Sequence, residues 1–356
     1  MRRLLPFALD IIALLAAWAA AAAPLPRRFI ENIYANGIFA HLNAAAVPLT
    51  NRVPFAVGDI EAAIAIVVLL ACWIVRLRRA PRGRKLRAAG ALLAHTAGWV
   101  GVLIVAFFLL WGWNYRRAPV TARVQFDETR VTDAAVDAYS AMIVDTLNTN
   151  YVAAHAETLD LGKLASAWSP LVQRLGDRWN VAVTVPKTTV LQPYYDAAGI
   201  GGQYSPLAFE TLLNKSFLSI EAPRAIAHEW AHVAGFTDEG DANYIGTLAC
   251  LRSNDPLIKY SGAFWTYGEL PERDRNRLHL DPRVIADFRE SDARFRKHYV
   301  PQLFAISWNL YDRYLHANNV SGGVASYGYF LQRLVGTRVD SDGLPLLRAR
   351  VRKQAS

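Results

Sequence analysis

Three long apolar runs occupy the first third of the chain, and the remainder alternates apolar and polar positions. The runs cover about residues 4–24, 58–76 and 88–113. Each run, with its flanks, can cross a hydrocarbon core about 30 Å thick. The first run could instead be a signal peptide, because it follows Met1-Arg2-Arg3, and any of the three could be a buried core helix. Because the first run is long for a signal peptide and two more follow it, we predict three transmembrane helices.

The loop between the second and third runs indicates how the chain is oriented. It contains seven basic residues within twelve positions: Arg76, Arg78, Arg79, Arg82, Arg84, Lys85 and Arg87. Such clusters stay on the cytoplasmic side of a membrane. This predicts a multi-pass protein of a bacterial inner (plasma) membrane, with a cytoplasmic N-terminus and a periplasmic or extracytoplasmic C-terminal domain. The net charge of +9 owes much to this loop, so we expect the lipid bilayer, and not a nucleic acid, as the partner of these basic residues.

The pattern divides the chain into residues 1–118, a membrane region, and residues 119–356, a domain outside the cytoplasm. Between the first two runs, residues 27–57 are too polar to cross a membrane, but Phe29, Ile30, Ile33, Tyr34, Ile38 and Phe39 recur at helical spacing. We therefore expect an interfacial segment that lies along the membrane.

The second part of the chain has mainly helical periodicity. It predicts helices over residues 132–154, 159–175, 243–252, 256–270, 284–298, 301–317 and 325–335. Dense β-branched residues at 181–185 and 188–192 predict two strands, and residues 204–213 predict a third. A further helix should open at Pro223 and stop near Gly235. The expected fold class is α+β: transmembrane helices followed by a mostly helical domain with a small β-sheet.

The segment His228-Glu229-Trp230-Ala231-His232 carries the clearest chemistry in the chain. Two histidines four residues apart share one helix face, so both imidazoles can reach one metal ion. Glu229 projects about 100° round the helix, where it can take a proton from water at the metal. A chance H-E-x-x-H is expected on the order of 0.01 times in such a chain. The pattern therefore predicts a Zn²⁺ site with Glu229 as general base.

A catalytic zinc usually takes a third protein ligand, and three carboxylates follow within nine residues. Asp238 stands six residues after His232 with Gly235 between them, which is the spacing of metzincin-like enzymes. Glu239 opens a Glu-x-x-Ala-Asn stretch, which resembles the E-x-x-A-D element of membrane-anchored zinc metalloproteases. That resemblance implies Glu239 as the ligand and Asn243 as a residue that supports a histidine. We favour Glu239, then Asp238, then Asp241, since some of these acids suit helix capping instead.

Larger pieces of the chain resemble an uncharacterised bacterial multi-pass membrane family. The pieces are residues 199–206, 228–236 and 239–244, with shorter ones at 111–115, 260–262 and 323–328. The family's signature is H-E-x-A-H-x-x-G-F-x-x-E-x-E-A-N, and Asp241 stands where the family usually has Glu. This departure favours Glu239 over Asp241 as ligand and leaves Asp241 a role beside the site. The resemblance implies a zincin-like fold and a metal, but no substrate.

Hydrolysis of a peptide bond at such a site would need a second group to stabilise the oxyanion. Tyr204, Tyr260 and Tyr327, each close to glycine, are the candidates, although tyrosines of this kind more often serve packing. The sequence therefore predicts a membrane-anchored zinc metallopeptidase that acts on a peptide or protein in the cell envelope. The alternative is a non-catalytic zinc-binding scaffold or sensor that keeps the zincin fold.

Overall fold

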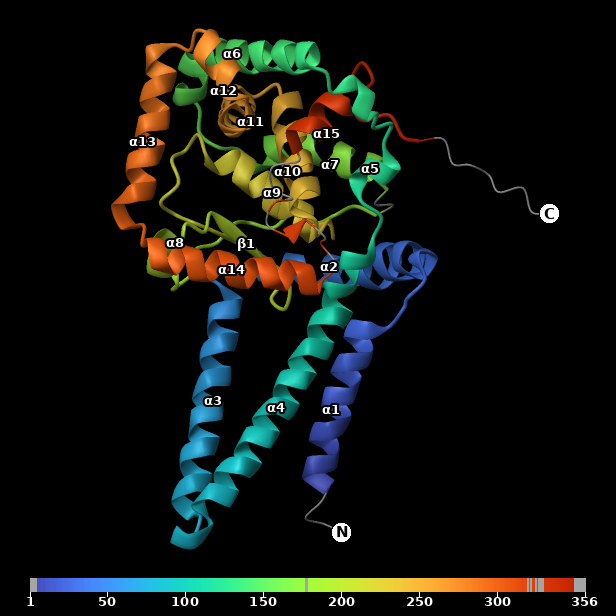
Figure 1. The fold of residues 1–356 in the computed structure, drawn as a ribbon, viewed down its shortest axis with the longest axis vertical. Coiled ribbons are helices and arrows are strands. Elements are labelled where there is room, and N and C mark those ends of the chain that lie inside the picture. The colour runs from blue at the N-terminus through green and yellow to red at the C-terminus, as the bar shows by residue number, and fades with distance from the viewer. Residues whose placement is uncertain are drawn as a thin grey trace, which may run out of the picture.

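The computed structural model describes residues 5–176, 179–318, 320, 322–323, 325 and 330–348. Figure 1 shows a mostly helical body with three long helices that project from one side of it. These helices are α1 (Leu5–Ala22), α3 (Val57–Arg79) and α4 (Lys85–Leu110). Most of the body follows α4 in the chain, while the segment between α1 and α3 also packs into it.

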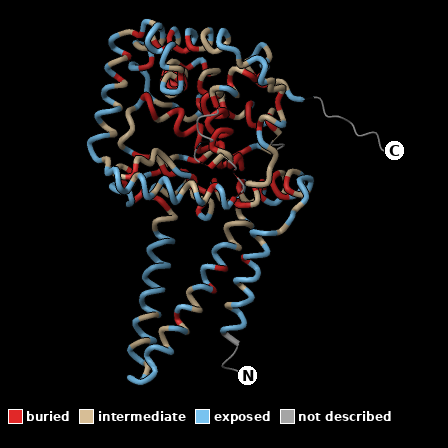
Figure 2. The backbone as a smooth tube through the Cα atoms, in the orientation of Figure 1, coloured by how far each residue is buried: buried red, intermediate tan, exposed pale blue. Residues whose placement is uncertain are grey.

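The projecting helices leave most of their apolar surface uncovered, as the pale colour along them in Figure 2 shows. Two helices of the described chain are long and apolar enough to cross a membrane: α3, and α4 together with the short turn η2 (Arg82–Arg84) before it. The apolar part of α1, Phe7–Ala22, is shorter. Helix α1 packs along α4, where Gly101 brings the two backbones so close that a β-carbon there would lie 3.0 Å from Ala13.

The segment between α1 and α3 folds against the body. It forms a π-helix, η1 (Phe29–Ile38), and helix α2 (Phe39–Thr50). Ile30, Tyr34 and Phe39 are fully buried, and Tyr34 and Phe39 belong to the main hydrophobic core. The helical spacing of these apolar residues therefore reflects packing against protein, while Ile33 and Ile38 remain exposed on the other side.

Among the described residues, the body is an assembly of helices with one small hairpin on the side from which the long helices project. After η3 (Gly112–Arg116) its elements are α5 (Val120–Arg123), η4 (Glu128–Arg130), α6 (Asp133–Ala156), α7 (Leu161–Arg174), α8 (Gln192–Ala198), β1 (Gly202–Ser205), β2 (Glu210–Leu213), α9 (Ala222–Val233), α10 (Glu239–Arg252), α11 (Pro256–Gly268), α12 (Glu272–Arg277), α13 (Pro282–His298), α14 (Pro301–Ala317) and α15 (Phe330–Gly336). Figure 1 shows α9 and α10 in the middle of this body. The largest fully buried side chains include Trp168 of α7 and Trp230 of α9, which pack edge to face.

Most helices predicted from periodicity are confirmed, and their ends follow local capping. Thr132 caps α6 and Asp160 caps α7 through their side chains, as Asp255 does for α11. Helix α14 has the predicted bounds. Helix α10 begins four residues before the predicted start, and the short helices α8 and α12 were not predicted.

The strand predictions need correction. The segment expected to form one strand over 204–213 is an antiparallel hairpin, in which Gly202 pairs with Leu213 and Ser205 with Glu210. Residues 181–185 and 188–192 form no strand. The side-chain NH₂ group of Asn51 donates to the Val183 carbonyl, and its side-chain oxygen accepts from the Val185 N–H. The β-branched residues favour an extended backbone, and side-chain hydrogen bonds hold it in place of a strand partner. One β-bridge, between Lys187 and Leu212, joins this segment to the hairpin.

Candidate metal centre

Helix α9 carries the two histidines and ends where the sequence predicts. Gly235 has φ of +82°, a left-handed conformation that suits glycine. The Gly235 N–H donates to the His232 carbonyl and the Phe236 N–H to the Ala231 carbonyl, both at 2.9 Å. This pair of bonds is the Schellman motif that closes a helix. The chain then turns back, and α10 packs along α9 with Glu239 as its first residue.

His228, His232 and Glu239 converge in the interior of the body. Glu239 Oε2 lies 3.2 Å from His228 Nε2 and 3.4 Å from His232 Nε2. One ligand atom of each residue lies within 4.8 Å of the other two. Two ligands bound tetrahedrally at about 2.0–2.1 Å from a zinc ion would be about 3.3 Å apart. The two distances from Glu239 therefore match a tetrahedral metal ion, and all three buried side chains are close enough to share one.

Three further contacts hold the cluster in this arrangement. His232 Nδ1 donates to the Phe236 carbonyl oxygen at 2.7 Å, which leaves Nε2 of the neutral imidazole free to bind a metal. The Tyr311 hydroxyl, from α14, donates to Oε1 of Glu239 and leaves Oε2 directed at the histidines. Trp111 donates from its indole to the His232 carbonyl at 2.9 Å. Contacts of this kind fix the orientation of ligands in metal sites.

The charges of the cluster depend on one another. Burial lowers the pKa of His228 to about 4. Burial also opposes protonation of His232, but the charge and hydrogen bond of Glu239, with the Glu229 charge and the Phe236 carbonyl, together outweigh it and raise the pKa of His232 to about 9. Burial would raise the pKa of Glu239, but the His232 charge and hydrogen bonds from both histidines hold it well below its usual range. The cluster thus contains one carboxylate, Glu239, and one imidazolium, His232. A metal cation that replaced the imidazolium proton would be attracted by the same carboxylate.

Glu229 lies beside the cluster, against strand β1. A β-carbon at Gly202 would come within 2.8 Å of Glu229 Oε1, so the missing side chain of Gly202 makes room for the carboxylate. The backbone N–H of Tyr204 bonds to the carboxylate, while Oε2 is buried without a hydrogen-bond partner among the described residues. Burial raises the pKa of Glu229 to about 7. A buried carboxylate with a free oxygen and a pKa near neutrality is suited to accept and return a proton.

The other acidic residues that follow the histidines have different partners. Asp238 caps α10 by accepting from the Asp241 N–H at 2.9 Å, and it pairs with Arg333 at 2.9 Å. Asp241 accepts from the Val120 N–H and pairs with Arg333 at 2.6 Å. Neither joins the His228–His232–Glu239 group. These two acids therefore tie α10 to α15 and to the chain that leaves the projecting helices.

Asn243 lies on α10 one turn after Glu239 and is buried. Its side-chain oxygen accepts from Arg224 Nη2 at 2.6 Å, and Arg224 also donates from Nε to Thr247 at 3.2 Å. Arg224 is itself buried on α9, one helical turn before His228. These bonds cross-link α9 and α10 directly beside the cluster.

The two candidate tyrosines that the structure describes, Tyr204 and Tyr260, belong to different hydrophobic clusters. Tyr204 is buried with its ring 5.7 Å from that of Trp111, and its backbone rather than its hydroxyl bonds to Glu229. Tyr260 donates to Asp287 in the second hydrophobic core. Tyr327 lies outside the described residues. Tyr311, which contacts Glu239, was not predicted, because nothing in the helical pattern of residues 301–317 distinguishes it.

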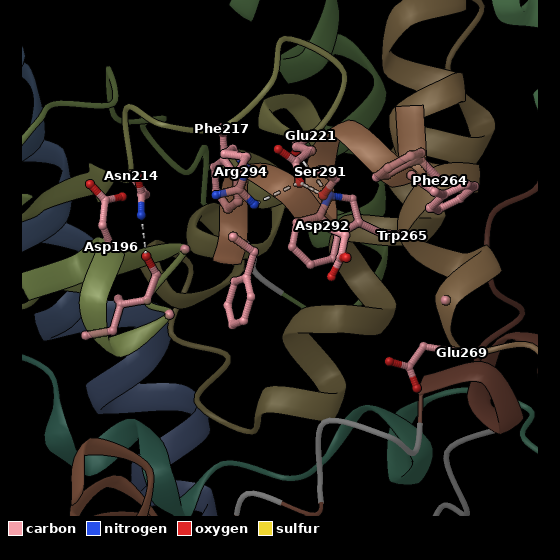
Figure 3. A pocket seen from close by; sticks show the side chains of 16 residues that line it. Asp196, Asn214, Phe217, Glu221, Phe264, Trp265, Glu269, Ser291, Asp292 and Arg294 are labelled. Atoms are coloured by element: carbon pink, nitrogen blue, oxygen red, sulfur yellow. Dashed lines mark hydrogen bonds and ion pairs between the residues drawn. The ribbon is translucent and has the colours of Figure 1, made fainter. Parts of the chain in front are cut away.

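A cavity of about 460 Å³ adjoins the hairpin, and Figure 3 shows it from close by. Its wall includes Gly201, the neighbour of the Gly202 that contacts Glu229. Phe217 and Trp265 line it with their rings. Arg294 points towards Glu221 in the figure and pairs with it at 3.1 Å. The cavity is thus partly aromatic and partly charged.

Comparison with known proteins gives one match. A family model described as "Protein of unknown function (DUF3810)" matches residues 34–335, which include α9, α10 and most of the rest of the body. No curated protein matches the chain, and no solved structure matches it.

Proposed function

The chain belongs to the DUF3810 family of proteins of unknown function, and for this member we propose a membrane-anchored zinc metallopeptidase that hydrolyses peptide bonds in the cell envelope. The observation that carries the proposal is the convergence of His228, His232 and Glu239, close enough to share one metal ion, beside the buried carboxylate of Glu229. A metal held by two histidines and one carboxylate, with a base alongside, is typical of zinc-dependent peptidases.

In this mechanism the chain binds the metal and moves protons. His228 and His232 would bind zinc through Nε2 and Glu239 through Oε2. The zinc would supply Lewis acidity, which acidifies water and polarises a carbonyl group. Glu229, with a pKa near 7, accepts the proton of the attacking water through its free oxygen. It then returns that proton to the amine that leaves.

The hairpin is suited to hold an extended peptide next to Glu229. The Tyr204 N–H faces Glu229 and not β2, so this edge of β1 points towards the site. An extended peptide can add to such an edge as a further strand. The cavity beside Gly201 would then take a side chain of that peptide. Such a placement of the peptide is what a zincin-like fold would require.

Membrane anchoring is supported by helices α3 and α4. Helix α3 is strongly apolar and none of its most apolar stretch is buried against protein, so a hydrocarbon environment would cover it favourably. The basic residues between α3 and α4 would lie in the cytoplasm, which places the body on the other face of the membrane. The short apolar helix α1 packs along α4 and would share the bilayer with it.

The test uses the full-length protein purified in detergent. Elemental analysis is expected to find about one zinc per chain, and His228→Ala to remove it. Hydrolysis of a quenched-fluorescence peptide library by the zinc-loaded protein is expected to fall about 10²–10⁴-fold in Glu229→Gln, which keeps the metal ligands. Glu290→Gln, an exposed carboxylate on α13, is the matched control and should retain activity. A wild-type protein without zinc would refute the proposal.

The burial of the cluster favours one second candidate, a zinc-binding scaffold or sensor without turnover. Structural zinc sites are closed, whereas catalytic ones keep an open position, and His228, His232 and Glu239 are each less than a tenth exposed. The His228→Ala and Glu229→Gln variants also distinguish the peptidase from the scaffold or sensor. A zinc-loaded Glu229→Gln protein that fully replaces the wild type in cells would favour the scaffold.

A further inference from the structure

Helix α14 lies across the side of the body from which the projecting helices leave, as Figure 1 shows. At one end it packs against α8, where Tyr194 and Ser307 share a hydrogen bond of 2.7 Å. The turn before α8 is bound to the start of α3, since the Val190 N–H donates to Asp59 at 2.7 Å. Helix α14 is thus linked through α8 to the first turn of a candidate membrane span.

The other end of α14 meets the end of the second candidate span. The Tyr314 ring lies 6.3 Å from that of Phe107 in the last turn of α4. Its hydroxyl accepts from the Tyr115 hydroxyl at 3.1 Å, just after that helix. Contacts at both ends therefore place α14 at the level where α3 and α4 meet the body.

The outer face of α14 is apolar. Leu303, Ile306 and Leu310 follow one another at intervals of three and four residues, which puts them on one side of the helix. They are 38%, 57% and 60% exposed. Val190, beside α3, is 78% exposed at the same side of the body. Water is an unfavourable environment for such a set of side chains.

Basic side chains lie near this level of the molecule. Arg313 is exposed on α14 one turn after Leu310. Arg27 and Arg28 follow the end of α1, and Arg52 precedes the start of α3, and all three are exposed. Arginines that flank apolar residues match the phosphates of lipid headgroups over the hydrocarbon region.

We propose that α14 lies in the interface of the bilayer that α3 and α4 cross, with Leu303, Ile306 and Leu310 among the lipids. The proposal rests on the membrane anchoring in the proposed function but not on zinc or on catalysis. Tyr311, which lies about 100° round the same helix from Leu310, bonds to Glu239. The His228–His232–Glu239 cluster then lies about one helix diameter, roughly 10 Å, from the membrane surface.

Spin labels on the full-length protein test this placement. Ile306→Cys and Leu310→Cys are made in a Cys72→Ser background and labelled, while Cys250 is fully buried. The protein is reconstituted in nanodiscs of phosphatidylcholine with a minor fraction of phosphatidylglycerol. Electron paramagnetic resonance then compares collisions of each label with oxygen, which enters lipid, and with a nickel chelate, which stays in water. Ala293→Cys on α13 is the aqueous control and Val67→Cys on α3 the lipid control, both being exposed in the structure.

Labels at Ile306 and Leu310 are expected to collide with the nickel chelate about tenfold less often than the label at Ala293, because they lie below the headgroups. Collision rates equal to those at Ala293, with Val67 in lipid, would overturn the proposal and leave the anchoring intact. Shielding from both reagents would also overturn it, since protein would then cover α14. An aqueous Val67 label would overturn both the anchoring and the placement. Zinc content, measured separately, decides the catalytic part of the proposed function.

Discussion

The backbones of Gly246 and His228 are in direct contact. A β-carbon at Gly246 would lie 2.8 Å from the amide nitrogen of His228 and 3.0 Å from its Cα. These neighbours are backbone atoms of a buried helix, so they cannot turn aside as a flexible side chain could. This contact sets how close α10, which begins at Glu239, can come to α9.

Gly246→Ala is therefore expected to separate the two helices and weaken the metal site. Overpacking of this kind typically lowers the free energy of unfolding by about 1–3 kcal/mol. We also expect zinc affinity to fall about tenfold, because Glu239 moves away from the histidines. Thermal unfolding and competition with a chelator measure the two effects. Gly268→Ala is the matched control, since a β-carbon at Gly268 meets nothing within 4 Å. Equal behaviour of the two variants would contradict this account.

Tyr311→Phe removes the hydroxyl that donates to Glu239 and keeps the aromatic ring. Loss of such a supporting bond typically weakens metal binding about 10–100-fold. The measurement is zinc affinity by chelator competition at fixed pH. Tyr194→Phe removes a different hydroxyl contact of α14, the bond to Ser307, and should leave the affinity within about twofold of wild type. An unchanged affinity in Tyr311→Phe would show that Glu239 needs no support from α14.

The parts of the site that sequence could predict are the local ones. His228 and His232 converge because four residues make about one helical turn, and Gly235 ends the helix through its backbone freedom. Which acid follows the histidines into the cluster depends on the path of the reversed chain. Tyr311 is 72 residues from Glu239 along the chain, and no local spacing connects them.

The same limit applies to the fold. The apolar spacing of residues 29–39 predicts a helical face that must be covered, but it does not say whether lipid or protein covers it. In the structure protein covers Tyr34 and Phe39. Likewise the β-branched residues 181–185 predict an extended backbone but not a strand partner, and the side chain of Asn51 satisfies part of that backbone.

The stability of the metal-free protein should depend on pH through Glu229. Burial raises the folded pKa of this carboxyl from 4.5 to about 7, so the folded state binds its proton more tightly than the unfolded state. Stability from this group is therefore present at low pH and is lost as the pH rises through 7. Glu229→Gln removes this loss. With a chelator present, the free energy of unfolding of the wild type should fall by about 2 kcal/mol more than that of the variant between pH 5 and pH 8. Parallel pH profiles of unfolding would contradict the raised pKa.

A buried ion pair joins the hairpin to the start of α3. Lys187 Nζ lies 2.8 Å from Glu210 Oε2, and both side chains are at most 3% exposed. Glu210 also accepts from the backbone N–H groups of Val57 and Gly58, the first residues of α3. One carboxylate thus satisfies two free donors of a helix N-terminus and the charge of a lysine.

Glu210→Gln should be strongly destabilising, because it leaves Lys187 charged and buried. Removing one partner of a buried pair typically costs about 3–5 kcal/mol. The double variant Lys187→Met with Glu210→Gln removes both charges, while the glutamine oxygen can still accept from the start of α3. It should recover at least half of the loss, measured by thermal unfolding of the detergent-solubilised protein. If the double variant is no more stable than Glu210→Gln alone, then the bonds from Glu210 to the start of α3, and not the ion pair, hold the hairpin to the projecting helix.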